Sequence, residues 1–127
     1  MIPQDLKFTK THEWTRLDGE IITIGISEYA IKQLGDIVYV ELPSAGTAVK
    51  REGAFGVIES VKAAVEIFSP VDGEVVQAND EITSNVELLS QDPYSQGWMV
   101  KIKAADPQQL DDLMAAADYK ELINSLE

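Results

Sequence analysis

Short runs rich in Val, Ile, Tyr and Thr, broken by Gly and Pro, fill roughly the first hundred residues of the chain. β-branched and aromatic side chains favour strands, whereas Gly and Pro favour the tight turns that separate them. The clearest hairpin spans residues 13–24, where the Asp18-Gly19 pair has the chemistry of a two-residue turn with positive φ. Further strands are predicted at residues 36–42, 55–61, 64–68, 74–78 and 98–103. The pattern therefore predicts a mainly β fold.

One early segment has helical periodicity instead. Residues 27–34 carry three apolar side chains on one helical face, namely Ala30, Ile31 and Leu34. Ser27 has the side chain of an N-cap residue, and Gly35 suits the position just after the last helical turn. We therefore expect a short helix near residues 27–34.

The C-terminal tail, about residues 106–125, also has a helical pattern. Asp106 and Pro107 form a cap and first-turn pair, and Asp118 and Glu121 have the spacing of a capping box for a last helix. The apolar stripe of the tail comprises Leu110, Leu113, Met114 and Ala117. We expect C-terminal helices that cover one edge or face of a sheet.

Size and charge limit the kinds of partner. The 127 residues suit a single domain over residues 1–127, with its core at about residues 21–103. Ten basic and twenty-two acidic side chains give a net charge of −12, which would repel nucleic acid and anionic lipid head groups. The acidity serves either solubility alone or docking onto basic patches of larger enzymes.

No apolar run approaches the length of a membrane span, and the N-terminus lacks the pattern of a signal peptide. These features predict a cytoplasmic protein that does not bind membranes. The chain has no cysteine, which leaves no disulfide, no thiolate nucleophile and no sulfur-ligated zinc. No metal site is expected, and any sulfur chemistry must come from an attached group.

A weak internal repeat suggests where a hairpin tip lies. The segments that begin at Gly35 and Gly73 both start with Gly, an acidic residue, an apolar residue and Val. Each is followed by a further apolar run, which would suit two half-sheets that face each other. The segment that joins them, residues 59–66, is then a hairpin with its tip near Lys62.

A carrier with a swinging arm needs an amine that a modifying enzyme can reach, and a lysine at a hairpin tip meets that need. Lysine carrying a lipoyl group extends on the order of 14 Å from its backbone, and tethering raises the effective concentration of the cargo. An exposed lysine taken alone is far more often an ordinary solvated residue. The sequence around Lys62 must therefore distinguish an attachment site from an ordinary exposed lysine.

Lys62 lies in the string ESVKAAVEIFSPVDGEV, with Gly46 sixteen residues before it and Gly73 eleven residues after it. This pattern is similar to the attachment signature of lipoyl domains. Further segments resemble, in order, the H proteins of the glycine cleavage system: KFTKTHEW from Lys7, TIGI from Thr23, LGDIVYVELP from Leu34, FGVIESVKA from Phe55, and then DPY and GWMVKIK. The resemblance covers nearly the whole chain.

The resemblance implies a lipoyl-domain-like barrel-sandwich hybrid of two facing antiparallel sheets, with lipoate bound covalently to Lys62. It implies a carrier and not an enzyme, so no catalytic residue is expected. In that family the arm takes the aminomethyl group of glycine from the P protein, a decarboxylase. It then delivers this group to the T protein, an aminomethyltransferase, and is reoxidised by the L protein, dihydrolipoamide dehydrogenase. A shuttle that visits three enzymes is expected to be monomeric.

Two sets of site residues follow from the resemblance. Lipoate-attaching enzymes would recognise the surroundings of the lysine, namely Glu59, Val61, Ala63, Gly46 and Gly73. The loaded arm would dock in a cleft formed by Thr11, His12, Glu13, Ile26, Ala30, Leu34, Ala63 and Glu66. Carboxylates at Glu13 and Glu66 would neutralise the cationic amine while an aliphatic wall excludes water.

The residues themselves leave other roles open for several of these positions. Glu59, Glu13 and Glu66 could equally be solvated acids, and the lone His12 is expected to have a structural or edge-strand role. The chain also departs from the family pattern, with Val65 where a small polar residue is common and Glu66 where Asp is common.

Four alternatives share part of this evidence. A biotin carrier has the same hairpin lysine, although methionines usually flank that lysine, whereas Val61 and Ala63 flank Lys62. A lipoyl domain of a 2-oxoacid dehydrogenase normally lacks the HEW segment and the helical tail. An acidic enzyme could use Glu59 and Glu66 as a carboxylate pair, but nothing supplies a partner nucleophile. A lipoyl relay, which hands lipoyl groups to other proteins, would use the same lysine.

Overall fold

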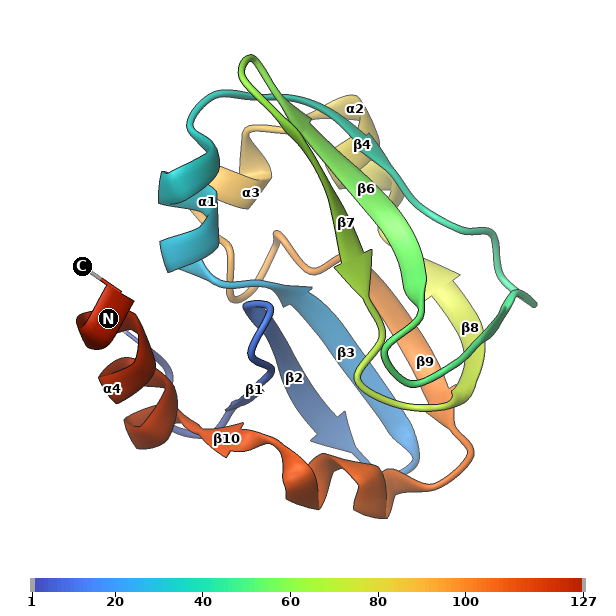
Figure 1. The fold of residues 1–127 in the computed structure, drawn as a ribbon. Helices are drawn as coiled ribbons and strands as arrows, with labels where there is room; N and C mark the ends of the chain where they lie inside the picture. Colours follow the sequence, from blue (N-terminus) through green and yellow to red (C-terminus); the bar gives the residue numbers. More distant parts are fainter. Residues whose placement is uncertain (1, 127) are drawn as a thin grey trace.

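The computed structural model describes residues 2–126 and consists of two antiparallel sheets with short helices around them (Figure 1). The larger sheet has the strand order β10-β1-β2-β3-β9-β8-β5, and the smaller has the order β4-β6-β7. The strands of the larger sheet are β1 (Lys7–Phe8), β2 (Glu13–Asp18), β3 (Ile21–Ile26), β5 (Ala48–Val49), β8 (Gly73–Ala78), β9 (Val100–Ala104) and β10 (Met114–Ala115). Those of the smaller sheet are β4 (Ile37–Glu41), β6 (Ala54–Ser60) and β7 (Ala64–Phe68). The predicted mainly β fold of two antiparallel sheets is confirmed.

The first hairpin differs from the prediction by one residue in its turn. Asp18 pairs with Ile21 as the last rung of β2 and β3, so the two turn residues are Gly19 and Glu20. The positive φ lies at Gly19, with a value of 65°. Glycine occupies the turn position that needs this conformation, as the chemistry requires, but Asp18 belongs to the strand.

The predicted short helix is confirmed as α1 (Glu28–Leu34). The Ser27 side chain accepts a hydrogen bond from Ala30 N, and Gly35, with a φ of 81°, ends the helix through its N–H to Ile31 O. Ala30, Ile31 and Leu34 are buried, as the periodicity indicates.

The predicted tail is partly wrong. Asp106 does cap a helix that begins at Pro107, but this is a short 3-10 helix, η1 (Pro107–Asp112). Leu113 and Met114 do not continue a helical stripe, because Met114 opens the strand β10. The last helix, α4 (Ala116–Leu126), begins before Asp118, which lies in its first turn and not at its N-cap.

Pairing with the other end of the chain overrides the local helical pattern there. Phe8 pairs with Met114, and Lys7 pairs with Ala115, so the tail adds an edge strand to the larger sheet before α4 begins. The sequence also did not predict β1, β5 or the two short helices α2 (Asp80–Ser84) and α3 (Leu88–Gln91). None of the helices among residues 2–126 has the length and apolar character that crossing a membrane requires.

Three hydrophobic clusters hold the two sheets and the helices together. The first, which includes Ile26, Ile58 and Ile67, lies between α1, the smaller sheet and the helices α2 and α3. The second packs the strands β3, β8 and β9. The third joins the two ends of the chain and consists of Leu6, Phe8, Trp14, Ala116 and Tyr119, with partly buried neighbours such as Trp98.

The internal repeat corresponds to two antiparallel strand pairs. The segment from Gly35 contributes β4, which pairs with β6, and the segment from Gly73 contributes β8, which pairs with β9. The predicted hairpin lies between these pairs, formed by β6 and β7, and its tip projects beyond the rest of the smaller sheet (Figure 1).

Candidate functional site

Lys62 lies at the exposed tip of the β6–β7 hairpin. The loop consists of residues 61–63, since Ser60 ends β6 and Ala64 begins β7. Ser60 N donates to Ala63 O at 2.7 Å and Val61 N donates to Asp36 O at 3.0 Å, which ties the tip to the loop before β4. The predicted hairpin around Lys62 is thus present in the structure.

Ser60 is a residue of this tip that the sequence analysis missed. Its hydroxyl accepts from Ala63 N at 3.1 Å and from Lys62 N at 3.4 Å, and donates to Ala63 O at 3.2 Å. The residue is only 8% exposed, although its neighbours at the tip are exposed. A serine that bonds to the backbone two and three residues ahead is a known turn signal, which could have identified it.

The other predicted recognition residues fall into two groups. Glu59, Val61 and Ala63 are all exposed beside Lys62. Gly46 and Gly73 lie instead in the larger sheet region, where Gly73 pairs with Val49 and Ala104, and Gly46 N donates to Val75 O. These two glycines therefore belong to the larger sheet region and not to the lysine hairpin.

Glycine is required at each of these two positions for a different local reason. Gly46 has a φ of 94°, a backbone conformation that disfavours residues with a Cβ. Gly73 has no positive φ, but a Cβ there would collide with the Lys103 carbonyl oxygen and the Ile102 side chain. The close approach of β8 and β9 thus requires the second glycine.

Glu13 is a buried carboxylate with a full set of partners. Its Oε1 accepts from the hydroxyls of Thr9 and Thr11, each at 2.5 Å, and its Oε2 accepts from Phe68 N at 3.3 Å. The residue is 1% exposed, so the expectation that it could be a simple surface acid is wrong. Burial raises the pKa of Glu13, and the hydrogen bonds from Thr11, Thr9 and Phe68 act in the opposite direction.

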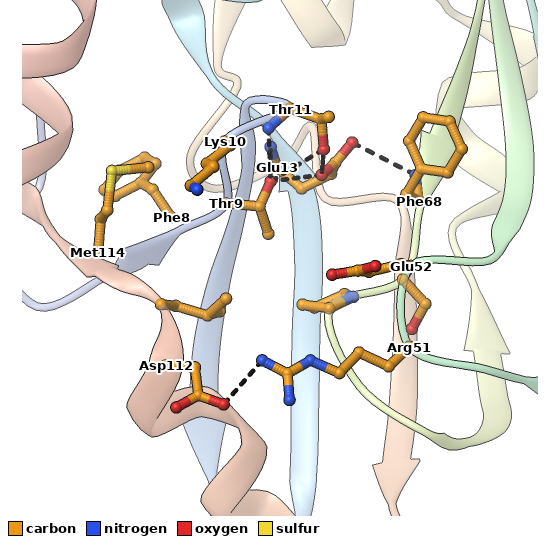
Figure 2. Close-up of a pocket in the computed structure, with 13 residues that line it drawn as sticks. Phe8, Thr9, Lys10, Thr11, Glu13, Arg51, Glu52, Phe68, Asp112 and Met114 are labelled. Carbon is orange, nitrogen blue, oxygen red and sulfur yellow. Dashed lines mark hydrogen bonds and ion pairs between the residues drawn. The ribbon is translucent and has the colours of Figure 1, made fainter.

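An open cleft of about 520 Å³ lies next to this carboxylate. Figure 2 shows Glu13 with Thr9 and Thr11 at one end of the cleft and the Arg51–Asp112 ion pair at the other. Other residues that line it are Phe8, Lys10, Glu52, Phe68, Ser69, Pro70, Leu113 and Met114. Of the predicted docking residues, only Thr11 and Glu13 line this cleft.

The remaining predicted docking residues lie elsewhere around β7. Ile26, Ala30 and Leu34 are 2%, 8% and 7% exposed and belong to the core cluster between α1 and the smaller sheet. Ala63 and Glu66 are exposed, and Glu66 stands on β7 two residues before Phe68, whose N–H reaches Glu13. Of the two carboxylates in the predicted set, Glu66 is therefore part of β7, whereas Glu13 reaches β7 from β2 through Phe68 N.

His12 has the structural surroundings that its isolation in the sequence suggested. It has a φ of 77° in the loop before β2, and its Nδ1 lies 2.8 Å from the hydroxyl of Tyr119. Burial lowers the pKa of His12. Among residues 2–126, no three side chains of His, Asp or Glu converge in a way that could hold a metal ion.

Comparisons with known proteins point in one direction. The family described as "Glycine cleavage H-protein" matches residues 6–126. A glycine cleavage system H protein of Anaeromyxobacter sp. (strain K) is 47% identical over 126 residues, which cover 99% of this chain and 98% of that protein. One from Halothermothrix orenii is 45% identical over the same length, with the same coverage. The crystal structure of a glycine cleavage system H protein from Mycobacterium marinum superposes with a TM-score of 0.89 at 28% identity, covering 97% of this chain and 99% of that one.

Proposed function

Because the chain belongs to the glycine cleavage H-protein family, whose members are non-catalytic lipoyl carriers, we propose that Lys62 bears the lipoyl group and that β7 guides the loaded arm toward Glu13. The protein is therefore a carrier of the glycine cleavage system. The observation that supports this attachment site most directly is that Lys62 is exposed on a hairpin tip whose conformation is fixed by hydrogen bonds.

The residues around Lys62 fit a covalent arm. The flanking side chains are short or exposed, and Val61, with 70% exposure, leaves the approach to the lysine open to a modifying enzyme. The carboxylate of Glu59 is exposed on the neighbouring strand, where a lipoate-attaching enzyme could recognise it. The bound lipoyl group would supply the reversible disulfide chemistry that a chain without cysteine lacks.

The length of β7 supports the docking proposal. A strand rises about 3.3 Å per residue and β7 begins only at Ala64, so Glu66 lies at most about 13 Å and Phe68 at most about 20 Å along the hairpin from Lys62. The reach of a lipoyl-lysine is on the order of 14 Å. An arm of that length along β7 would bring its end to Glu66, close to the point where Phe68 N meets Glu13.

The chain would then shelter its cargo with two carboxylates and the apolar lining of the cleft. An aminomethyl group carries a cationic amine, which Glu66 can meet from β7 and Glu13 from β2. Ile26, Ala30 and Leu34 are buried in the core, so the apolar lining comes from Phe8, Phe68 and Met114. Burial of Glu13 favours its neutral form in the absence of a cation, so the arrival of an amine would favour ionisation of this carboxyl group.

The partners follow from membership in the glycine cleavage system. The proposal is that this one domain acts as a monomer in the cytoplasm and visits the P, T and L proteins in turn. Its net charge of −12 supports docking onto basic patches of these larger enzymes.

Intact mass spectrometry with peptide mapping tests the attachment site. Protein purified from its own source should carry a lipoyl increment on Lys62, and Lys62→Arg should abolish it while Lys101→Arg should not. A biotinyl increment would redirect the protein to the biotin carriers. The absence of any modification on Lys62 in all preparations would refute the proposal.

The shelter has its own test. The double variant Glu13→Gln, Glu66→Gln should release ammonia and formaldehyde from the loaded arm faster than the wild type. A control variant, Glu74→Gln, removes an exposed carboxylate on β8 and should leave release unchanged. Equal release from the double variant and the wild type would contradict the role of the two carboxylates.

A further inference from the structure

Tyr119 is a fully buried tyrosine of α4 with both a packing contact and a polar contact. Its ring stacks on Phe8 with 4.3 Å between ring centroids and 4° between ring planes. Its hydroxyl lies 2.8 Å from His12 Nδ1 and 2.6 Å from Ser27 Oγ. The ring belongs to the core, so the hydroxyl is the part of this residue that needs a separate explanation.

The two partners of the hydroxyl lie side by side just beyond the β2–β3 pair, where Ser27 N also donates to His12 O at 2.9 Å. His12 is part of the loop before β2, in which Thr9 and Thr11 donate to Glu13. Ser27 is the N-cap of α1. One hydroxyl on a third element thus binds both the loop that supplies the donors of Glu13 and the N-terminus of α1.

One assignment of the protons gives each hydroxyl proton of this network a partner. In it Ser27 Oγ, which accepts from Ala30 N at 3.3 Å, donates to the Tyr119 hydroxyl, and Tyr119 donates to His12 Nδ1. His12 is then neutral, with its hydrogen on Nε2. Burial also lowers the pKa of His12 and raises that of Tyr119, which favours the neutral form of both.

The loop that His12 occupies needs such support. A φ of 77° is uncommon for a residue with a side chain and persists where surrounding contacts fix it. Backbone bonds from His12 N to Thr9 O at 3.2 Å and from Ser27 N to His12 O at 2.9 Å contribute, and the Tyr119 hydroxyl fixes the ring. In this loop the hydroxyls of Thr9 and Thr11 donate to Glu13 Oε1.

We propose that Tyr119 is a positioning residue of the cargo shelter: its hydroxyl fixes the loop that carries Thr9, Thr11 and Glu13 relative to the N-terminus of α1. The proposal rests on the proposed function, because it concerns the same shelter. α4 thereby acts on the cargo without touching it, through His12 and Ser27.

Tyr119→Phe tests the hydroxyl alone, because phenylalanine keeps the stack on Phe8. The chain has a single histidine, so ¹⁵N NMR of the imidazole reports on His12 without ambiguity. In the unmodified wild type we expect the Nε2–H tautomer with a hydrogen-bonded Nδ1. In the variant we expect the Nδ1 signal to lose this hydrogen-bond shift, and the amides of Thr11 and Glu13 to exchange about fivefold faster.

The second readout uses the lipoylated, loaded protein. Tyr119→Phe should release ammonia about fivefold faster than the wild type. Tyr94→Phe is the matched control, because the Tyr94 hydroxyl accepts from Glu28 N at 3.1 Å and so supports the same helix without contacting His12. This control should change release by less than about twofold.

Three results would overturn the proposal. One is an unchanged imidazole spectrum, and another is wild-type release from Tyr119→Phe. A third is equal acceleration by both variants, which would mean that any loosening of α1 suffices. Peptide mapping beforehand distinguishes failure of the proposed function from failure of the role of Tyr119. An unmodified Lys62 in the wild type refutes the proposed function and the shelter together. A lipoylated Lys62 with unchanged ammonia release from Tyr119→Phe refutes only the role of Tyr119.

Discussion

The hydroxyl of Ser60 should determine how firmly the hairpin tip presents Lys62. Ser60→Ala removes one bond from Ala63 N at 3.1 Å, one to Ala63 O at 3.2 Å and a marginal one from Lys62 N at 3.4 Å. A net hydrogen bond contributes about 1 kcal/mol, and the freed backbone groups at the exposed tip can bind water. We therefore expect a local loss of about 1 kcal/mol, which is roughly a fivefold larger open population of the tip.

Amide hydrogen exchange by NMR measures this population directly. The amides of Lys62 and Ala63 should exchange roughly fivefold faster in Ser60→Ala, because their shared acceptor is gone. The bond from Val61 N to Asp36 O remains, so exchange elsewhere and the midpoint of thermal unfolding should change little.

Two further variants control the comparison. Ser60→Thr keeps the hydroxyl and should keep wild-type exchange, whereas Ser90→Ala removes an exposed hydroxyl on α3 and should have no effect. Exchange at Lys62 and Ala63 within about twofold of the wild type in Ser60→Ala would refute the reasoning. The tip would then owe its shape to its backbone bonds alone.

Three other predictions concern stability. Gly73→Ala should lower the free energy of unfolding by more than about 2 kcal/mol, because its Cβ would collide with a carbonyl of β9. Gly46→Ala should lower it by only about 1 kcal/mol, through backbone strain. Equal losses in urea unfolding would contradict the two explanations. Burial raises the pKa of Glu13 above 4.5, so above this pH the folded state keeps a proton that the unfolded state loses. The free energy of unfolding therefore falls as the pH rises from 4.5 through the pKa of the folded state. The stability of the wild type relative to Glu13→Gln should therefore decline as the pH rises above 4.5, and a constant difference would count against this prediction. Arg51→Ala should cost less than about 1 kcal/mol, since the Asp112 side chain of this ion pair is 67% exposed; a larger fall in thermal stability would show that this pair has a greater role.

The strands of the fold were largely predictable, because alternating apolar residues and turn residues act locally. The two-residue turn after β2, the α1 helix with its Ser27 cap and the β6–β7 hairpin all follow from neighbours in sequence. The tail was not predictable in this way. Met114 has a helical neighbourhood, but it pairs with Phe8, which lies more than a hundred residues earlier in the chain.

The functional site was predictable only at Lys62, where the residue type itself provides the chemistry of attachment. Lys62 could be found from its spacing and its surroundings, whereas the burial of Glu13 depends on a turn in which His12 adopts a positive φ. Histidine is among the residues enriched at positive φ, but the conformation is uncommon for any residue other than glycine, so a single histidine does not predict it. Tyr119 had no signal either, because an apolar helical face does not reveal where a hydroxyl will lie.

The cluster that joins the two ends of the chain has a consequence for how the protein is made. Phe8 and Trp14 leave the ribosome about a hundred residues before Ala116 and Tyr119, which pack against them. Until then two large aromatic side chains lack this cover and are more open to other nascent chains. The final packing of this end of the larger sheet therefore waits for residues 114–119, and a stop codon before Met114 would leave an aggregation-prone product with the Lys62 hairpin intact.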